Sequence, residues 1–189
     1  MAREADAAGI QAIYAPVVTE TAISFETEPP GVAEMVRRVA ETLPEHPWLV
    51  LDDAGAILGY AYGHRFAARA AYLWSVETSV YLRPEARGRG AGRALYAALI
   101  AILRAQGYRQ AIGGVALPNP ASVALHESLG FRPMGVYRRV GWKLGAWHDV
   151  GWWQLALTGE EGPPAPPTPV DRLPVATLSA ATKGGPHVR

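Results

Sequence analysis

Two neighbouring stretches in the middle of the chain have different hydrophobic periodicities. Residues 76–82 alternate and are rich in β-branched and aromatic side chains, which predicts a strand. Residues 91–103 carry apolar side chains at three- and four-residue spacing, which predicts an amphipathic helix. Between them lies the glycine-rich stretch R-G-R-G-A-G, residues 87–92. The pattern therefore predicts a strand, a tight turn and the start of a helix in direct succession.

The same periodicities divide most of the remaining chain into short elements. Helices are predicted at 7–15, at 32–43 and from Pro120 to about residue 129. Further strands are predicted at 48–51, 57–62, 111–115, 131–137 and 150–157, the last two antiparallel. The sequence therefore predicts one α/β (α+β) domain built around a sheet.

The glycine-rich turn has the features of an anion site. A turn that leads into a helix start directs backbone N–H groups and the positive end of the helix dipole into one concavity. Arg87, Arg89 and Arg93 add full positive charge. A dinucleotide fingerprint would need glycine at position 93, and a P-loop would need a following Lys-Ser or Lys-Thr, so neither applies. A phosphate cradle is predicted, with a basic turn that binds nothing as the alternative.

Composition narrows the class of protein. The 189 residues are 49% hydrophobic and 19% charged, with a net charge of +1, so nucleic acid is not expected to be the principal partner. There is no cysteine, which excludes disulfides, thiolate metal sites and an acyl-cysteine intermediate. No apolar run approaches the ~20 residues that span a bilayer, and the N-terminus does not have the layout of a signal peptide. A cytoplasmic protein without membrane contact is predicted.

The composition changes after residue 157. Residues 158–189 contain seven of the 16 prolines and almost no large apolar side chains. A folded domain at 1–157 and a proline-rich, disordered C-terminal tail at 158–189 are predicted, with a docking role for the tail as the alternative.

Several separate strings of residues resemble one family. They are F-E-T-E-P at 25–29, W-S-V-E-T-S-V-Y at 74–81, L-P-N-P-A-S at 117–122, L-H-E-S-L-G-F at 125–131 and G-A-W-H-D-V-G-W-W-Q at 145–154. Together with the R-x-x-G-x-G turn they resemble the phosphinothricin and methionine sulfoximine acetyltransferase branch of the GNAT superfamily, over about residues 3–157. The resemblance implies the GNAT fold, a central mixed sheet that is splayed open and flanked by helices. Relatives begin with an apolar strand that is short or absent here.

The resemblance also implies a co-substrate and its binding residues. Acetyl-CoA would lie in the splay, with its pyrophosphate on residues 87–93 and its pantetheine arm paired with backbone of residues 80–82. The residues expected to bind it are Val80, Tyr81, Leu82, Arg87, Gly88, Arg89, Gly90, Ala91, Gly92, Arg93, Asn119 and Ser122. Members of this branch acetylate the α-amino group of small amino-acid-like compounds and are usually homodimers.

Two residues are candidates for proton transfer. An amine attacks a thioester only when it is unprotonated, so a base is needed, and Glu77 in the strand before the turn is the best candidate. His126 stands where many GNAT enzymes have a tyrosine that protonates the departing thiolate; it could serve that step or pair with Glu77. The alternatives are a solvent-facing or arginine-paired Glu77 and a helix histidine without a role. Backbone N–H groups near Val80 could also polarise the thioester carbonyl.

The acceptor site is predicted from both the chemistry and the resemblance. The anionic groups of an amino-acid analogue suit arginine, and Arg69 and Tyr72 lie where this branch keeps an arginine and a tyrosine near the substrate. Phe25, Thr27 and Glu28 lie in the loop that lines the acceptor pocket in relatives.

No metal site is predicted. His148 and Asp149 lie next to the predicted strand 150–157, and adjacent residues of a strand point to opposite faces, so the two are interpreted as structural residues. Three functions stay open: an N-acetyltransferase for small molecules, which is preferred; a protein or peptide acetyltransferase; and a non-catalytic acyl-CoA sensor. The presence of both Glu77 and His126 argues against the sensor.

Overall fold

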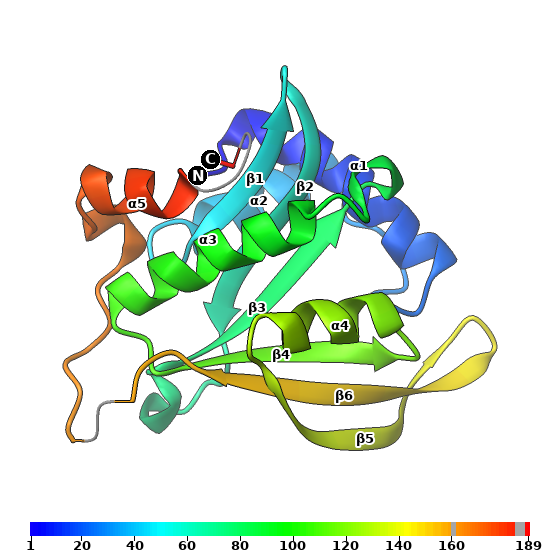
Figure 1. Cartoon of the computed structure of the whole chain (residues 1–189). Coiled ribbons are helices and arrows are strands. Elements are labelled where there is room, and N and C mark those ends of the chain that lie inside the picture. The colour runs from blue at the N-terminus through cyan, green and yellow to red at the C-terminus, as the bar shows by residue number, and fades with distance from the viewer. Residues whose placement is uncertain (160–161, 184–187) are drawn as a thin grey trace.

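The computed structural model describes residues 1–159, 162–183 and 188–189, and its elements form one six-stranded sheet with helices on both faces (Figure 1). The strands are β1 (Trp48–Asp53), β2 (Ala56–Arg65), β3 (Ser75–Leu82), β4 (Gln110–Leu117), β5 (Arg132–Lys143) and β6 (Ala146–Ala156). The helices are α1 (Ala7–Glu20), α2 (Val32–Thr42), α3 (Ala91–Gln106), α4 (Pro120–Ser128) and α5 (Val175–Thr182), with 3-10 turns at Glu4–Asp6, Ala70–Tyr72, Pro84–Ala86 and Val170–Arg172.

The sheet is mixed, with the strand order β1-β2-β3-β4-β6-β5. All neighbouring pairs are antiparallel except β3 and β4, which are parallel. These two strands pair only where residues 75–77 face residues 110–112, and they diverge beyond Glu77. The predicted splayed sheet is confirmed, because the two halves separate at this point as the arms of a V (Figure 1).

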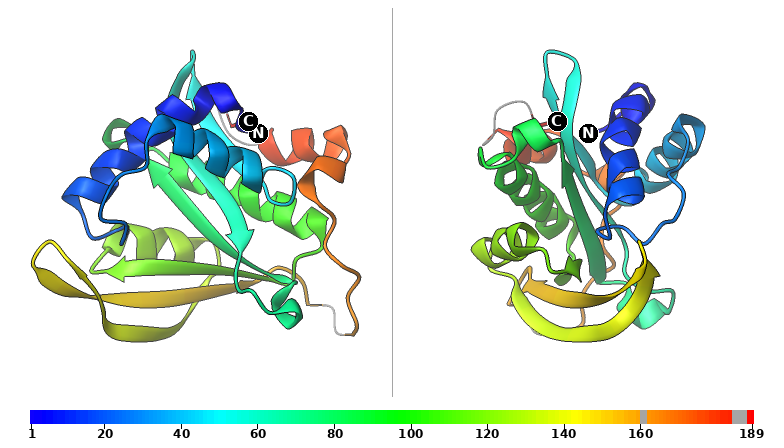
Figure 2. Two further views of the ribbon diagram at one scale, coloured as in Figure 1. Left: turned by 180° about the vertical axis from the view of Figure 1, so that it is seen from behind. Right: turned by 90° about the vertical axis from the view of Figure 1, so that its right-hand side faces the viewer.

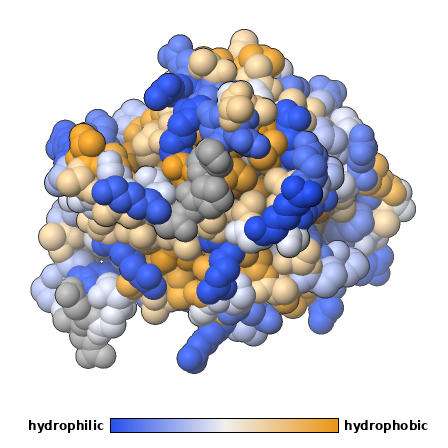
Figure 3. Space-filling model, turned by 45° about the horizontal axis from the view of Figure 1, so that its top comes forward, coloured by the Kyte–Doolittle hydropathy of each residue, from blue (hydrophilic) through white to orange (hydrophobic). Residues whose placement is uncertain are grey.

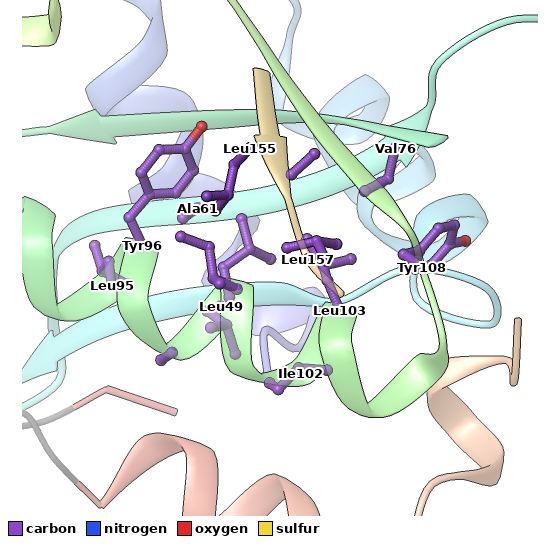
Figure 4. Packing of buried hydrophobic residues seen from close by; sticks show 14 of the residues in the cluster. Leu49, Ala61, Val76, Leu95, Tyr96, Ile102, Leu103, Tyr108, Leu155 and Leu157 are labelled. Atoms are coloured by element: carbon purple, nitrogen blue, oxygen red, sulfur yellow. The ribbon is translucent and has the colours of Figure 1, made fainter. Parts of the chain in front are cut away.

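Helices cover the two faces of the sheet in different pairs. Figure 2 shows α1 and α2 on one side and α3 and α4 on the other. The larger core lies between the sheet and α3, whose Leu95, Ile102 and Leu103 are fully buried (Figure 4). The second core lies between α1, α2 and the first two strands, around Ile10, Val39 and Tyr60. On the face in Figure 3, hydrophilic and hydrophobic residues are interspersed.

The expected helices and strands are present, with shifted ends. Strands β5 and β6 extend until only Leu144 and Gly145 are left as the turn between them, so the segment 141–146 is mostly strand. No strand precedes α1: the chain enters through the 3-10 turn Glu4–Asp6, and the Ala2 amide donates to the Trp48 carbonyl beside β1. Of the two predicted possibilities, a short first strand or none, the structure has none.

The C-terminal segment is more ordered than predicted. Its described residues include α5, which packs on α3, and the buried side chain of Val170. Val188 is also buried, and Arg189 exchanges backbone hydrogen bonds with Val50 of β1 and forms ion pairs with Asp6. These residues are ordered, in contrast to the prediction, because a few apolar side chains of the segment pack against the core of the domain. Residues 160–161 and 184–187 lie outside the described part of the chain.

Candidate active site

The glycine-rich turn adopts the shape that the sequence predicts. Gly88 and Gly90 have positive φ angles of 71° and 79°, a conformation that side-chain-bearing residues rarely adopt. Gly90 is the residue before α3, and the first N–H groups of a helix have no partner within it. The turn and the helix start therefore form an anion-binding concavity with open space above the glycines.

A cavity of about 340 Å³ lies over this turn. Ten of the twelve residues expected to bind acetyl-CoA line it: Val80, Tyr81, Leu82, Arg87, Gly88, Gly90, Gly92, Arg93, Asn119 and Ser122. The other two do not: Arg89 is exposed, and Ala91 packs toward the core at the first turn of α3. The cavity lining includes both the turn and residues 80–82 at the diverging end of β3, the two segments that the sequence analysis assigned to the pyrophosphate and the pantetheine arm.

Three polar side chains at this cavity also hold its walls together. Arg87 donates to the Leu82 carbonyl, which ties the turn to the end of β3. Arg93 donates to the backbone and side chain of Ser128, which joins α3 to α4. The Asn119 side chain accepts from the Ser122 amide at 3.1 Å and so caps α4.

Glu77 lies where β3 and β4 begin to diverge. Its side chain is 27% exposed and borders a second cavity, of about 320 Å³, which Phe25, Tyr137 and Trp152 also line. Ile23 lines both this cavity and the one over the glycine turn, so the two cavities adjoin at that side chain. Burial raises the pKa of the Glu77 carboxyl, and the neighbouring His64 opposes that shift. A carboxylate with a raised pKa at this point is suited to accept a proton.

His126 lies on the other face of the sheet. It is 4% exposed, and its Nδ1 is 2.8 Å from the Ser122 carbonyl, which can only accept. Nδ1 therefore carries a proton, and Nε2 accepts from the Tyr96 hydroxyl at 3.0 Å. Tyr96 in turn contacts the Thr78 hydroxyl at 2.6 Å. Burial lowers the pKa of His126, so this network holds a neutral imidazole.

The alternation of strand β3 separates the two predicted catalytic side chains. Thr78 points toward α3 and the network of His126, so its neighbour Glu77 points to the opposite face. The structure therefore does not bring Glu77 and His126 together. Gly113 of β4 lies directly under the His126 ring, where a Cβ atom would overlap it.

The predicted acceptor residues are divided. Phe25 borders the cavity of Glu77 and packs against Gly141 of β5. Thr27 and Glu28 are exposed and do not line it. Arg69 and Tyr72 lie at the 3-10 turn before β3, also outside its lining.

Tyr72 nevertheless lies close to this region. Its ring meets the edge of Phe66, with centroids 5.6 Å apart. Phe66 lines a cavity of about 280 Å³ that shares Tyr137 and Trp152 with the cavity of Glu77.

The acceptor loop is anchored by residues that the sequence analysis did not select. The Tyr14 hydroxyl contacts Ser24 and donates to Glu26, each at 2.8 Å. Arg38 forms an ion pair with Glu26 and lowers the pKa of that carboxyl. Lys143, buried at the end of β5, donates to the Ser24 carbonyl at 2.6 Å. Glu26 lies within the F-E-T-E-P string, but only the packing of α1 and α2 shows that it fixes the loop.

His148 and Asp149 have structural contacts. His148 Nε2 donates to the Lys143 carbonyl at 2.9 Å, and Asp149 forms an ion pair with Arg138. Across the described ranges, no group of three or more His, Cys, Asp or Glu side chains could hold a metal ion. Nor does the described part of the chain contain a helix of the length and apolar character needed to cross a membrane.

Comparison with known proteins relates this chain to the acetyltransferases. The acetyltransferase (GNAT) domain matches residues 1–152, and the chain belongs to this family. A phosphinothricin N-acetyltransferase of Streptomyces viridochromogenes is 37% identical over 169 residues, which cover 89% of this chain and 90% of the relative.

Two further relatives are of the same kind. An L-methionine sulfoximine/L-methionine sulfone acetyltransferase of Pseudomonas aeruginosa is 37% identical over 155 residues, covering 81% of this chain and 90% of the relative. The crystal structure of a phosphinothricin acetyltransferase from Sinorhizobium meliloti in complex with AcCoA has a TM-score of 0.79 and 40% identity, and covers 82% of this chain and 85% of that one. The predicted family and fold are confirmed.

Proposed function

We propose that this chain transfers an acetyl group from acetyl-CoA to the α-amino group of a small amino-acid-like acceptor, of the phosphinothricin or methionine sulfoximine type. The observation that carries the proposal is that two cavities adjoin at Ile23 and that Glu77 borders one of them. One has the glycine turn and the diverging backbone of β3, which suit a phosphate-bearing arm. The other is small and lined by aromatic side chains, which suits a small acceptor. The relatives' names agree with this assignment.

In the proposed reaction, Glu77 accepts a proton from the acceptor ammonium, directly or through a water molecule. The free amine then attacks the thioester carbon, the C–S bond breaks, and CoA leaves as a thiolate. The nitrogen loses one further proton as the amide forms, and this proton neutralises the thiolate. Holding both reactants in one orientation supplies much of the acceleration, up to roughly 7–11 kcal/mol for ideal geometry. Backbone N–H groups near Val80 stabilise the oxyanion that forms at the carbonyl.

For His126 we propose a supporting role. Both of its ring nitrogens have partners, and it lies on the face opposite Glu77. It connects α4 to α3 through Tyr96 and so holds the wall that carries Asn119 and Ser122. Arg69 and Tyr72, at the turn before β3 and outside the lining of the Glu77 cavity, stay proposed acceptor residues.

The test is thiol release from acetyl-CoA with a panel of acceptors. Phosphinothricin, methionine sulfoximine and methionine sulfone should be acetylated, while polyamines and a lysine peptide should not. Glu77→Gln should lower kcat by about 100-fold or more and leave the Kd of acetyl-CoA unchanged. Turnover only with the lysine peptide would establish the peptide acetyltransferase instead. Binding of acetyl-CoA without turnover of any acceptor would favour the sensor.

We also propose that the chain forms a homodimer through the hairpin of β5 and β6. This hairpin lies at one edge of the sheet and exposes large apolar side chains, among them Met134, Val140, Trp142, Leu144 and Trp147. Such a concentration of apolar surface is typical of an interface between subunits. Analytical ultracentrifugation should give twice the chain mass for the native protein and the chain mass for Trp142→Glu. A native monomer would refute the proposal.

The predicted cytoplasmic location stays a prediction from the sequence.

A further inference from the structure

His64 lies directly opposite Glu77 in the sheet. The register of β2 and β3 makes the two residues cross-strand partners, and their side chains share one face. His64 Nε2 is 3.9 Å from Glu77 Oε1, a gap that a small side-chain rotation or a bridging water closes. The His64 side chain is 38% exposed and that of Glu77 is 27% exposed, so His64 is the more solvent-accessible of the two.

The tautomer of His64 is favourable for accepting a proton from Glu77. Its Nδ1 is 3.3 Å from the carbonyl oxygen of Arg65, and a carbonyl can only accept a hydrogen bond. Nδ1 therefore carries the proton of the neutral ring, and Nε2, the nitrogen that faces Glu77, is left with its lone pair.

On its other side, His64 lines a cavity of about 430 Å³ between α2 and the first two strands. The titratable and charged groups that line it with His64 are Arg38, Glu41, Glu45, His46 and Arg65, with the phenols of Tyr14, Tyr60 and Tyr62. Glu41 and Glu45 are exposed at its rim, so a proton that reaches this cavity meets carboxylates and solvent. The acceptor cavity, in contrast, is lined by apolar and aromatic side chains apart from Glu77 itself.

We propose that His64 is a positioning residue that acts through Glu77: during turnover it takes from Glu77 the proton that Glu77 has received from the acceptor. This inference rests on the proposed function. The acceptor ammonium gives its proton to the Glu77 carboxylate, and the resulting carboxylic acid gives it to Nε2 of the neutral His64. Glu77 is again a carboxylate and His64 an imidazolium, which releases the proton to water in the α2 cavity. No bond to carbon changes in this step, and no further reactant is needed.

The step gives His64 a role that packing alone would not. In the proposed complex the acceptor fills the cavity that Glu77 borders and restricts direct exchange of the Glu77 proton with solvent. His64 also lines the cavity beside α2, which offers a second path to solvent. The imidazolium also holds Glu77 ionised, because an adjacent positive charge favours the carboxylate.

The test compares His64→Gln with His46→Gln, a matched control in the same cavity that does not contact Glu77. His64→Gln should lower kcat about tenfold, with the KM for the acceptor and the Kd of acetyl-CoA within twofold of the native values. The acid limb of its kcat/KM profile should move to higher pH, because the cation beside Glu77 is lost. Added imidazole should restore turnover of His64→Gln and have no effect on the native enzyme or on His46→Gln.

Two results would overturn the inference: an unchanged pH profile in His64→Gln, or a lowered kcat that imidazole does not restore. His64→Lys separates charge from proton exchange, since it keeps a cation beside Glu77. Full activity in that variant would also contradict the relay. Absence of turnover by the native enzyme with every acceptor of the panel would instead refute the proposed function, so the two failures are distinguishable.

Discussion

Removing the Tyr96 hydroxyl tests the buried network around His126. Tyr96→Phe keeps the ring that stacks on Phe131 and deletes only the oxygen between Thr78 and His126. Thr78 keeps the Ile112 carbonyl as an acceptor, but Nε2 of His126 loses its partner in a site where Tyr96 is fully buried. An unsatisfied buried polar group costs about 1–3 kcal/mol, so we expect a loss of about 2 kcal/mol in the free energy of unfolding.

Urea unfolding followed by tryptophan fluorescence measures this loss, with an unchanged m value as the sign that only stability has changed. For a chain of 189 residues, 2 kcal/mol corresponds to a fall of about 4–8 °C in Tm. Tyr137→Phe is the stability control, because its side chain is exposed and its variant should stay within about 0.5 kcal/mol of the native protein. A loss below 0.5 kcal/mol in Tyr96→Phe would refute the assignment of this network.

The activity of the same variant tests the role of His126. If His126 only supports α4, Tyr96→Phe should keep kcat within about threefold of the native value at temperatures where it is folded. A 100-fold loss of kcat in the folded variant would instead show that the His126 imidazole exchanges protons in the reaction, as the sequence analysis predicts.

Three other outcomes follow from the geometry of the site. A Cβ atom at Gly141 would overlap Phe25, so Gly141→Ala should displace that ring at a cost of about 1–3 kcal/mol and raise the KM for the acceptor. Gly135 on the same strand has open space, so Gly135→Ala should leave this KM unchanged. Equal KM values for the two variants in a steady-state assay would contradict the prediction. Gly90→Val places a branched side chain at a residue with a positive φ angle and should weaken acetyl-CoA binding tenfold or more in calorimetry. An unchanged Kd would refute the assignment of this turn as the phosphate-binding site. Burial raises the pKa of Glu77, and the base acts when it is deprotonated. We therefore expect kcat/KM to fall as the pH drops through a value above the usual glutamate range. If the same acid limb is still present in Glu77→Gln, Glu77 is not the group that causes it.

Features set by local constraints could be predicted from the sequence. The alternation of β3, the periodicity of α3 and the positive φ angles of Gly88 and Gly90 follow from residues that are adjacent in the chain. The anion cradle, residues 87–93, consists only of such features, and five of its seven residues line the cavity: Arg87, Gly88, Gly90, Gly92 and Arg93.

Relations between elements could not be predicted in the same way. The separation of Glu77 from His126 depends on which face of the sheet α4 covers, and no spacing within the chain states this. The pairing of Glu77 with His64 depends on the register of β2 against β3 across a connection of nine residues, 66–74. The loop anchors Glu26 and Arg38 lie on different elements, so their ion pair becomes visible only when α2 is placed.

The order of the C-terminal segment has its cause in α3 rather than in the segment itself. Leu95, Leu99 and Leu103 face the sheet, but Ile100 lies about 140° around the helix from Leu95 and is also buried, at 3% exposure. A helix with so wide an apolar surface needs a cover on its second side. Segment 158–189 has few apolar side chains, yet Val170, Leu173 and Leu178 join the core that contains α3, and α5 packs on that helix. The composition of segment 158–189 therefore indicated disorder. The signal for its order lies in residues 91–106, because the apolar surface of that helix is wider than the sheet alone covers.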